Sequence, residues 1–461
     1  MTALHDRSAV ELLALYAARE ASPVDVMRDL LAHIERCEPR IAATWALDAE
    51  AALAQARDSQ ARWQRGEQRA LDGVPVTIKE NIATRGTPVP LGTAATVLAP
   101  AAADAPPAAR LREAGALIVC KTTMPDYGML SSGLSSFHKL ARNPWDLSKS
   151  PGGSSAGAAA ACAAGYGPLH LGTDIGGSIR LPAGWCGVVG FKPSLGRIPI
   201  DPPYAGRVAG PLTRTVEDAA LAMTVLSLPD ARDAMSLPWQ DIGWRELDIR
   251  LRGLKLGLWL DAGWGTSVTT EVRAAVEAAA SAFEHAGAIV ELVPPFTTRA
   301  MADGMDHFWR MRSWLEISGL PVECQARVLP FIRQWAARGE TLSAAQVFRG
   351  YSQMAALRDA AVAATQRFDF VLSPVSPAVA FAAESAMPSN DPARPFEHIA
   401  FTLPFNMSEQ PALALNAGSG ASGLPIGLQI AGHRHDDLGV LRLARAWEQL
   451  RGPQPPWPAL A

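Results

Sequence analysis

Two glycine- and serine-rich segments in the middle of the chain have the composition of loops that perform chemistry. The first, residues 151–157, reads PGGSSAG and directly precedes an alanine-rich stretch typical of a helix. A loop that opens a helix points backbone N–H groups outward and suits anions, so a phosphate site is one interpretation and a flexible linker is another. Both are disfavoured, because no Walker-type Lys-Ser/Thr pair follows and a helix follows at once.

The same segment also matches the G-x-S-x-G pattern of a hydrolase nucleophile elbow, with Ser155 at its centre. That elbow requires a strand before it, whereas residues 146–150 are polar and lead into a proline. The match therefore favours Ser155 as a nucleophile only weakly. A partial β-lactamase pattern, S-x-x-K at residues 136–139, lacks its companion motifs in the required order and is set aside.

The second segment carries the stronger signal for nucleophilic catalysis. Asp174 to Ser178 reads DIGGS and follows the apolar strand-like run at residues 169–171. Two glycines ahead of a serine allow successive N–H groups to converge on one point, which is what an oxyanion hole requires. Ser178 is therefore a candidate nucleophile, and a nucleophilic serine needs a base.

Histidine is the usual base, but the nearby His170 alternates toward the interior of its strand, where packing is the simpler interpretation. A lysine serves instead if burial lowers its pKa. Lys79 fits this role because it ends the apolar run at residues 74–78, where a charge is unexpected. The alternative is that Lys79 is an ordinary strand-end lysine in solvent.

Motifs spread over most of the chain resemble the amidase signature family, serine hydrolases that use a Ser-cisSer-Lys triad. The resembling segments are residues 73–81, 151–157, 172–182, 187–197, 210–214, 401–406 and 423–429. Carried over residue by residue, the resemblance implies that Ser178 is the nucleophile, Ser154 is the bridging serine after a cis peptide bond, and Lys79 is the base. The spacing of these three residues along the chain also matches the family.

The resemblance further implies roles for the neighbours of the triad. The expected oxyanion donors are the backbone N–H groups of Ile175, Gly176, Gly177 and Ser178. Asp174 and Arg180 are expected to form an ion pair that supports the nucleophile loop, and Ser155 to assist the hydrogen-bond network.

Three segments are expected to shape the substrate pocket. In the family, the segment matching residues 123–133, which contains Gly128, contributes to the pocket wall. Residues 306–314 add apolar bulk, although Met305, Phe308 and Trp309 share a helical face that is more typical of core packing. Residues 202–204 form a candidate rim loop. The family commonly has glycine where this chain has Glu409, which leaves the polarity of the pocket open.

These residues predict an amidase that cleaves a small-molecule amide through a covalent acyl-enzyme on Ser178, with Ser154 relaying a proton to Lys79. Ester and carbamate substrates share the same chemistry. The alternative is the glutamine-hydrolysing subunit of a tRNA-dependent amidotransferase, which would require a partner protein. A non-catalytic scaffold is disfavoured because all three triad positions are kept.

The elements expected to position these residues alternate between strands and helices, which predicts an α/β fold. We expect a large mixed, mostly parallel β-sheet sandwiched between helices, as in amidase signature enzymes, with a helical N-terminal segment over residues 1–70. Helical patterns also dominate residues 298–368, which predicts a cap. Because no linker divides the chain, residues 1–461 are expected to form a single amidase domain.

Composition excludes several other classes of function. Among 461 residues, 42 Lys+Arg against 45 Asp+Glu leave a net charge of −3, so there is no electrostatic footprint for nucleic acid. Glycine and proline interrupt the long charge-free runs, so no membrane span is expected. Five scattered cysteines indicate free thiols in a reducing cytoplasm. No metal or cofactor is expected, and His433–Asp436 is interpreted as a solvated turn. A homodimer is one option for the assembly.

Overall fold

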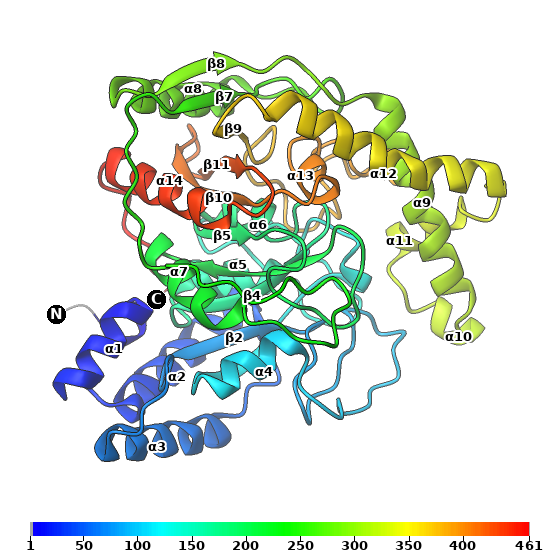
Figure 1. The fold of residues 1–461 in the computed structure, drawn as a ribbon. Coiled ribbons are helices and arrows are strands. Elements are labelled where there is room, and N and C mark those ends of the chain that lie inside the picture. The colour runs from blue at the N-terminus through cyan, green and yellow to red at the C-terminus, as the bar shows by residue number, and fades with distance from the viewer. Residues whose placement is uncertain (1–2, 461) are drawn as a thin grey trace.

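An eleven-stranded β-sheet forms the centre of the computed structural model, which describes residues 3–460 (Figure 1). The strand order is β1-β3-β2-β4-β6-β5-β10-β11-β9-β7-β8. Strands β3, β2 and β4 are parallel on one flank, and β9, β7 and β8 are parallel on the other. The pairings that join these flanks, and that of β1, are antiparallel.

The mixed α/β sheet is thus confirmed, but the expectation of a mostly parallel sheet needs correction. Within residues 3–460, four of its ten strand pairings are parallel. The reason is clearest at β10 and β11, where only residues 420–424 connect the two strands. A parallel crossover needs a dozen or more residues, so this short connection imposes antiparallel pairing.

Most strands are short, apolar and buried. In chain order they are β1 (Thr44–Trp45), β2 (Pro75–Lys79), β3 (Leu117–Thr122), β4 (Leu169–Asp174), β5 (Val189–Lys192), β6 (Val208–Thr213), β7 (Lys255–Leu258), β8 (Ile289–Leu292), β9 (Phe370–Pro374), β10 (Ala412–Ser419) and β11 (Pro425–Gly432). Strands β2, β4, β5, β6 and β9 are buried along their whole length, so nearly every side chain they carry lies within a packed layer.

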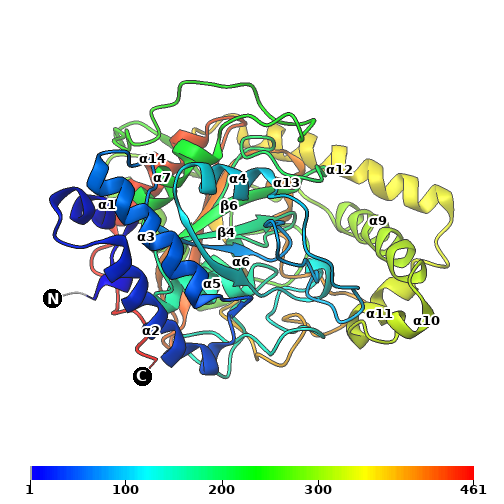
Figure 2. The same ribbon diagram turned by 90° about the horizontal axis from the view of Figure 1, so that it is seen from below.

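Helices cover both faces of this sheet (Figures 1 and 2). They are α1 (Ala9–Ala18), α2 (Pro23–Ile41), α3 (Ala49–Arg65), α4 (Pro106–Glu113), α5 (Ala156–Ala164), α6 (Arg180–Cys186), α7 (Val216–Leu226), α8 (Thr270–His285), α9 (Arg299–Ser318), α10 (Val322–Gln325), α11 (Pro330–Ala337), α12 (Ala344–Thr365), α13 (Leu403–Met407) and α14 (Asp437–Leu450). One apolar core includes residues of α1, α4, α7, α8 and α14, and α5 and α6 contribute to a second.

Local signals explain where the N-terminal helices begin. The Ser8 side chain accepts from the N–H of Glu11, whose carboxylate in turn accepts from the N–H of Ser8, a capping box that starts α1. Ser22 and Asp25 repeat this arrangement at α2, with Pro23 as its first residue. The expected helical N-terminal segment is therefore present as α1, α2 and α3.

Helices α9 to α12 project from one end of the molecule and coincide with the helical region expected at residues 298–368 (Figures 1 and 2). Buried Asp126 ties this cap to the body, because its carboxylate accepts hydrogen bonds from Ser136 and from the N–H of Leu329, 3.1 Å away. The cap therefore stands over the loop that precedes Gly128.

Two general expectations are met by direct observation. Across residues 3–460, none of the helices combines the length and the apolar character that crossing a membrane would require. All five cysteines have free thiols.

Candidate active site

Three segments of the chain bring Lys79, Ser154 and Ser178 to one edge of the sheet. Lys79 ends β2, Ser154 lies in the loop before α5, and Ser178 lies in the loop between β4 and α6. Strands β2 and β4 are parallel neighbours, so their carboxyl ends meet at the same edge. The N–H of Ser155 donates to the carbonyl of Ser178 at 3.1 Å, which joins the two loops directly.

The amine of Lys79 lies within hydrogen-bond distance of three hydroxyl groups. Its Nζ atom is 2.8 Å from Oγ of Ser154, 3.0 Å from Oγ of Ser155 and 3.0 Å from Oγ1 of Thr173. The lysine is fully buried, so the interpretation of Lys79 as a solvent-exposed strand end is wrong. Thr173 was not identified from the sequence, although it lies inside the motif at residues 172–182.

Burial makes the Lys79 amine a usable base. Desolvation disfavours the charged form and lowers the pKa of Lys79 from 10.5 to about 7, although the negative charges of Asp174 and Glu80 act in the opposite direction. A substantial fraction of the amine is then neutral at neutral pH. A neutral amine 2.8 Å from a serine hydroxyl can accept its proton.

The loop that carries Ser154 is held in an unusual backbone conformation. The peptide bond between Gly153 and Ser154 is cis. Gly153 packs so tightly that a Cβ atom there would lie 2.6 Å from the backbone nitrogen of Ser132. Gly128 has a φ of +68°, and a Cβ atom there would lie 3.3 Å from Oγ of Ser154. Glycine at both positions therefore leaves room for the Ser154 hydroxyl.

The nucleophile loop offers free N–H groups beside Ser178. Within the described chain, the N–H groups of Ile175, Gly176 and Ser178 have no hydrogen-bond acceptor. The N–H of Gly177, in contrast, donates to Oδ1 of Asp174 at 2.8 Å. Of the four donors expected from the sequence, three are thus available to a ligand and Gly177 is occupied by the aspartate.

A buried ion pair supports this loop from beneath. Arg180 Nε lies 3.0 Å from Oδ2 of Asp174, and Arg180 NH2 lies 3.0 Å from its Oδ1. Burial by itself would raise the pKa of Asp174, but the charge and hydrogen bonds of Arg180 more than offset it and hold this pKa well below its usual range. The carboxylate therefore stays charged and keeps the loop closed around it.

The same arginine reaches residues near the C-terminal end of the fold. Its guanidinium donates to the carbonyl of Thr402 at 2.9 Å, to Oδ1 of Asn406 at 2.6 Å and to Oε1 of Gln429 at 2.7 Å. Asn406 and Gln429 lie in motifs that the sequence displays, but no role was predicted for them. Their spacing from Arg180, more than 200 residues, hides the contact from any local pattern.

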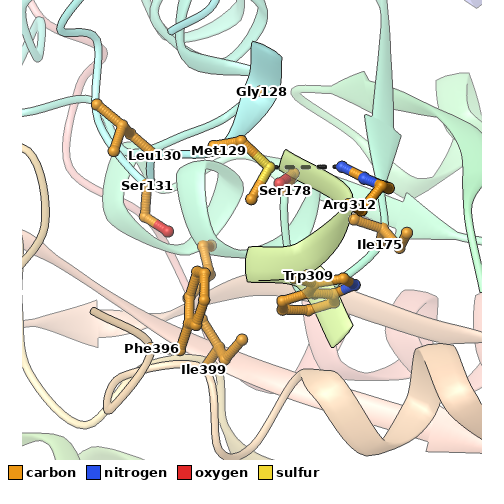
Figure 3. A pocket seen from close by; sticks show the side chains of 12 residues that line it. Gly128, Met129, Leu130, Ser131, Ile175, Ser178, Trp309, Arg312, Phe396 and Ile399 are labelled. Atoms are coloured by element: carbon orange, nitrogen blue, oxygen red, sulfur yellow. Dashed lines mark hydrogen bonds between the residues drawn. The ribbon is translucent and has the colours of Figure 1, made fainter. Parts of the chain in front are cut away.

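An apolar pocket opens beside Ser178 and encloses about 430 Å³ that is open to solvent (Figure 3). Its lining residues are Gly128, Met129, Leu130, Ser131, Ile175, Gly176, Ser178, Leu181, Trp309, Arg312, Phe396 and Ile399. The segments expected at 123–133 and 306–314 both contribute to it. Arg312 is the charged residue among the described lining residues, and none of them is acidic.

Several other expectations about the pocket are decided individually. Trp309 lines it, but Met305 is buried in the core and Phe308 stacks edge-on against Tyr351 at 5.3 Å. The carboxylate of Glu409 does not reach it, because that residue lies 3.1 Å from Arg434 in an ion pair.

Two histidine-containing motifs lie apart from the site. His170 is buried between the Thr77 hydroxyl and the Gly167 carbonyl, and burial lowers its pKa to about 3, which fits a neutral packing residue. In the turn at residues 433–436, Asp436 accepts from the N–H of Gly439 at the start of α14. Among residues 3–460, no three His, Cys, Asp or Glu side chains are grouped as metal ligands.

A buried lysine joined to serine hydroxyls, with free N–H groups beside a pocket, is the arrangement of a serine hydrolase that uses lysine in place of histidine. The chain belongs to the amidase family, whose model, described as Amidase, matches residues 25–441. Membership, together with the amidase signature fold, makes this protein an enzyme that cleaves the C–N bond of amides.

Relatives and solved structures extend over nearly the whole chain. The A-type glutamyl-tRNA(Gln) amidotransferase subunit of Myxococcus xanthus is 35% identical over 486 residues, which cover 97% of each protein. The crystal structure of a bacterial aryl acylamidase of the amidase signature family matches with a TM-score of 0.90 at 30% identity, covering 97% of each chain. The corresponding amidotransferase subunit from Thermotoga maritima matches with a TM-score of 0.79 at 26% identity, covering 99% of this chain and 98% of that one.

Proposed function

We propose that this protein hydrolyses a small-molecule amide through a covalent acyl-enzyme on Ser178, with Lys79 as the base and Ser154 as the proton relay. One observation carries the proposal: the buried Lys79 amine, whose pKa is about 7, lies 2.8 Å from the hydroxyl of Ser154. A lysine so placed has lost its solvation and gained serine partners, which suits it for proton transfer and not for a surface charge.

The first half-reaction forms the acyl-enzyme. Neutral Lys79 accepts the proton of Ser154 while Ser154 accepts that of Ser178, and the Ser178 oxygen forms a bond to the amide carbonyl carbon. The carbonyl electrons move to oxygen, which becomes the oxyanion. When the C–N bond breaks, the proton held by Lys79 returns through Ser154 to the departing nitrogen, which leaves as a neutral amine.

The second half-reaction uses the same groups with water as the nucleophile. Water attacks the ester carbonyl, its proton passes to Lys79 through Ser154, and the Ser178 oxygen leaves with that proton. The free N–H groups of Ile175, Gly176 and Ser178 are the proposed donors to both oxyanions. In comparable sites, one such donor lowers the barrier by about 3 to 4 kcal/mol.

The lining of the pocket favours an apolar group on the substrate. Leu181, Phe396 and Ile399 lie together on one side of it, and Trp309 adds an aromatic wall (Figure 3). Burying such a group contributes about 25 cal/mol per Å² of apolar surface removed from water. We therefore place amides with an apolar acyl or aryl group first among the substrates, with esters and carbamates following by the same chemistry.

A second candidate is the glutamine-hydrolysing subunit of a tRNA-dependent amidotransferase. The observation that favours it is the 35% identity to the Myxococcus amidotransferase subunit over 97% of both chains, a higher identity than that to the aryl acylamidase. Glutamine carries an ammonium group, whereas the described lining of this pocket contains Arg312 and no carboxylate. This absence of a carboxylate keeps the independent amidase as our first proposal.

A turnover panel separates the two candidates. Purified protein is assayed on aliphatic amides, anilides, carbamates, esters and glutamine, beside the Ser178→Ala variant. The amidase proposal expects turnover of anilides or aliphatic amides that Ser178→Ala loses. Turnover of glutamine alone, rising when amidotransferase partner subunits are added, would replace it with the second candidate. A fluorophosphonate label on intact protein, located by peptide mass spectrometry, checks that Ser178 is the nucleophile.

A further inference from the structure

Two arginines beside the candidate active site have unusual surroundings. Arg312 comes from α9 and lines the same pocket as Ser178, and Arg207 lies in the loop just before β6. We propose that Arg312 and Arg207, together with the Tyr204 hydroxyl, bind a carboxylate group of the substrate, so that the enzyme prefers amides that carry a free carboxylate. This proposal rests on the amidase function proposed above and names its substrate class.

The three residues form one cluster. The guanidinium of Arg312 lies over the ring of Tyr204, 5.0 Å from its centroid. Tyr204 and Arg207 are the ends of a tight turn, closed by the Arg207 N–H, which donates to the Tyr204 carbonyl at 3.0 Å. The loop at residues 202–204, expected from the sequence to form a rim, therefore brings a second arginine toward the pocket.

This cluster lacks the hydrogen-bond partners that buried polar groups require. In the described part of the chain, Nε of Arg207, Nε of Arg312 and the hydroxyl of Tyr204 are buried without any partner. The other side-chain contacts of the arginines are weak acceptors for a charge: Arg207 donates to the Pro202 carbonyl and Arg312 to Sδ of Met129 at 3.5 Å (Figure 3). Buried donors without acceptors are costly, so a ligand that supplies acceptors would bind favourably.

Other buried arginines of the same protein show what is missing. Arg180, Arg197 and Arg310 each form an ion pair with a carboxylate, at distances of 3.0, 3.0 and 2.5 Å. No described carboxylate takes this place at Arg207 or Arg312. A carboxylate on the substrate has the planar, two-oxygen geometry that a guanidinium binds best.

Electrostatics also selects the charge of the ligand. Burial and the positive charge of Arg312 lower the pKa of Arg207, so the two cations destabilise one another when the site is empty. The charge of Arg207 likewise acts to lower the pKa of Lys79, which places it within electrostatic range of the base. An anion between the arginines would relieve this repulsion, whereas a ligand with only an ammonium group would add to it.

The cluster is held in register with the reacting groups. The carbonyl of Gly206, inside the same turn, accepts from Nδ2 of Asn406 at 3.0 Å, and that amide nitrogen also lies 2.9 Å from Oδ1 of Asp174. The apolar wall made by Phe396 and Ile399 belongs to the same pocket as Arg312. The substrate class is therefore an amide with an apolar group and a carboxylate, such as a half-anilide of a dicarboxylic acid or an N-acyl aminobenzoate.

Two matched substrate pairs test this inference and locate the carboxylate. The monoanilide of succinic acid is compared with butyranilide, which places the charge on the acyl side. A 4-(acylamino)benzoate is compared with the corresponding 4-acylaminotoluene, which places it on the amine side. For each pair the ratio of kcat/KM, acid over neutral, is measured for wild type, Arg312→Gln, Arg207→Gln and the control Arg338→Gln, an exposed arginine on the same cap.

We expect both pocket variants to lower the ratio for at least one pair by at least about tenfold, because a hydrogen bond to a charged group contributes about 1.5 to 3 kcal/mol. Arg338→Gln should leave the ratio within about twofold of the wild-type value, since an exposed charge far from the ligand is screened by solvent. Comparing ratios between enzymes cancels the intrinsic reactivity of each amide. If Arg312→Gln and Arg207→Gln leave the ratio of both pairs unchanged, the inference is overturned.

A binding measurement keeps this inference separate from the proposed function. Calorimetric titration of Ser178→Ala with the same acids and neutral analogues should give tighter binding of an acid, and adding Arg312→Gln should remove that preference. If wild type turns over none of the four amides but Ser178→Ala still binds an acid selectively, the amidase proposal fails and the carboxylate site stands. Equal binding of acid and neutral ligand with normal anilide turnover would give the opposite outcome.

Discussion

The burial of Lys79 predicts how turnover depends on pH. If this amine is the base, the enzyme is active with Lys79 neutral and inactive with it protonated. Because burial lowers the pKa of Lys79 from 10.5 to about 7, kcat/KM should be half of its plateau value near pH 7. Below that pH it should fall about tenfold per unit, and between pH 8 and 9 it should be constant.

The magnitude follows from the same pKa. A pKa of about 7 leaves about half of the amine neutral at pH 7, whereas the ordinary value of 10.5 would leave about one molecule in 3,000 neutral. Burial thus supplies roughly a thousandfold more active enzyme at neutral pH. The corresponding free energy, from a shift of about 3.5 units at 1.36 kcal/mol each, is about 5 kcal/mol, which the fold spends on keeping the charged amine out of water.

The assay measures initial rates of anilide hydrolysis between pH 5 and 10 at constant ionic strength, at substrate concentrations well below KM. Circular dichroism at each pH verifies that the protein remains folded. Asp218→Asn is the matched control, because burial raises the pKa of that carboxyl to about 7 although it lies on α7, bonded to the N–H of Val10. This variant should keep the acid limb of the wild-type profile.

Two results would refute the reasoning. A limb whose midpoint lies above pH 9 would mean that Lys79 keeps its ordinary pKa and that the buried amine is not neutral in the working enzyme. A Lys79→Ala variant that retains near-normal turnover at pH 7, with the same limb, would mean that another group titrates and that the base is assigned wrongly.

Three further predictions concern variants of the site. Asp174→Asn leaves the Arg180 guanidinium buried without its counter-charge and should lower the free energy of unfolding by about 3 to 5 kcal/mol, measured by urea denaturation; a loss below about 1 kcal/mol would contradict this. Lys79→Met should unfold at a higher urea concentration than wild type at pH 7. The difference should shrink toward pH 10.5, since the unfolded lysine binds more protons than the folded one in that interval, so that wild-type stability rises with pH. Gly128→Ala, at φ +68° and 3.3 Å from the Ser154 hydroxyl, should lower kcat by at least about tenfold, whereas unchanged kcat would show that Ser154 tolerates a methyl group there.

Much of the fold can be predicted because its elements carry local signals. Residues 49–65 and 270–285 are amphipathic, and this pattern predicts helices within a residue or two of α3 and α8. Strand β6, in contrast, is missed by sequence reasoning. It contains Gly210 and Pro211, and a proline inside a run argues against a central strand, yet β6 lies between β4 and β5. Only the neighbouring strands, not its own sequence, determine that it is a strand.

The candidate site divides in the same way. Lys79, Ser154 and Ser178 lie in compact motifs, so their residue types and spacing are enough to select them. The occupied N–H of Gly177 could not be foreseen, because it depends on where the carboxylate of Asp174 points. The cluster around Arg312 joins residues more than 100 positions apart, and no local pattern encodes its missing partners.

The order of strands in the sheet also governs when the enzyme can become active during its own synthesis. Strand β5 ends at residue 192, but its second neighbour, β10, begins at residue 412. The ribosome therefore adds about 220 residues while one edge of β5 stays unpaired, open to other strands or to chaperones. Gln429, which holds Arg180, arrives later still. A nascent chain that already carries Lys79, Ser154 and Ser178 would thus remain inactive until β10 and β11 insert into the middle of the sheet.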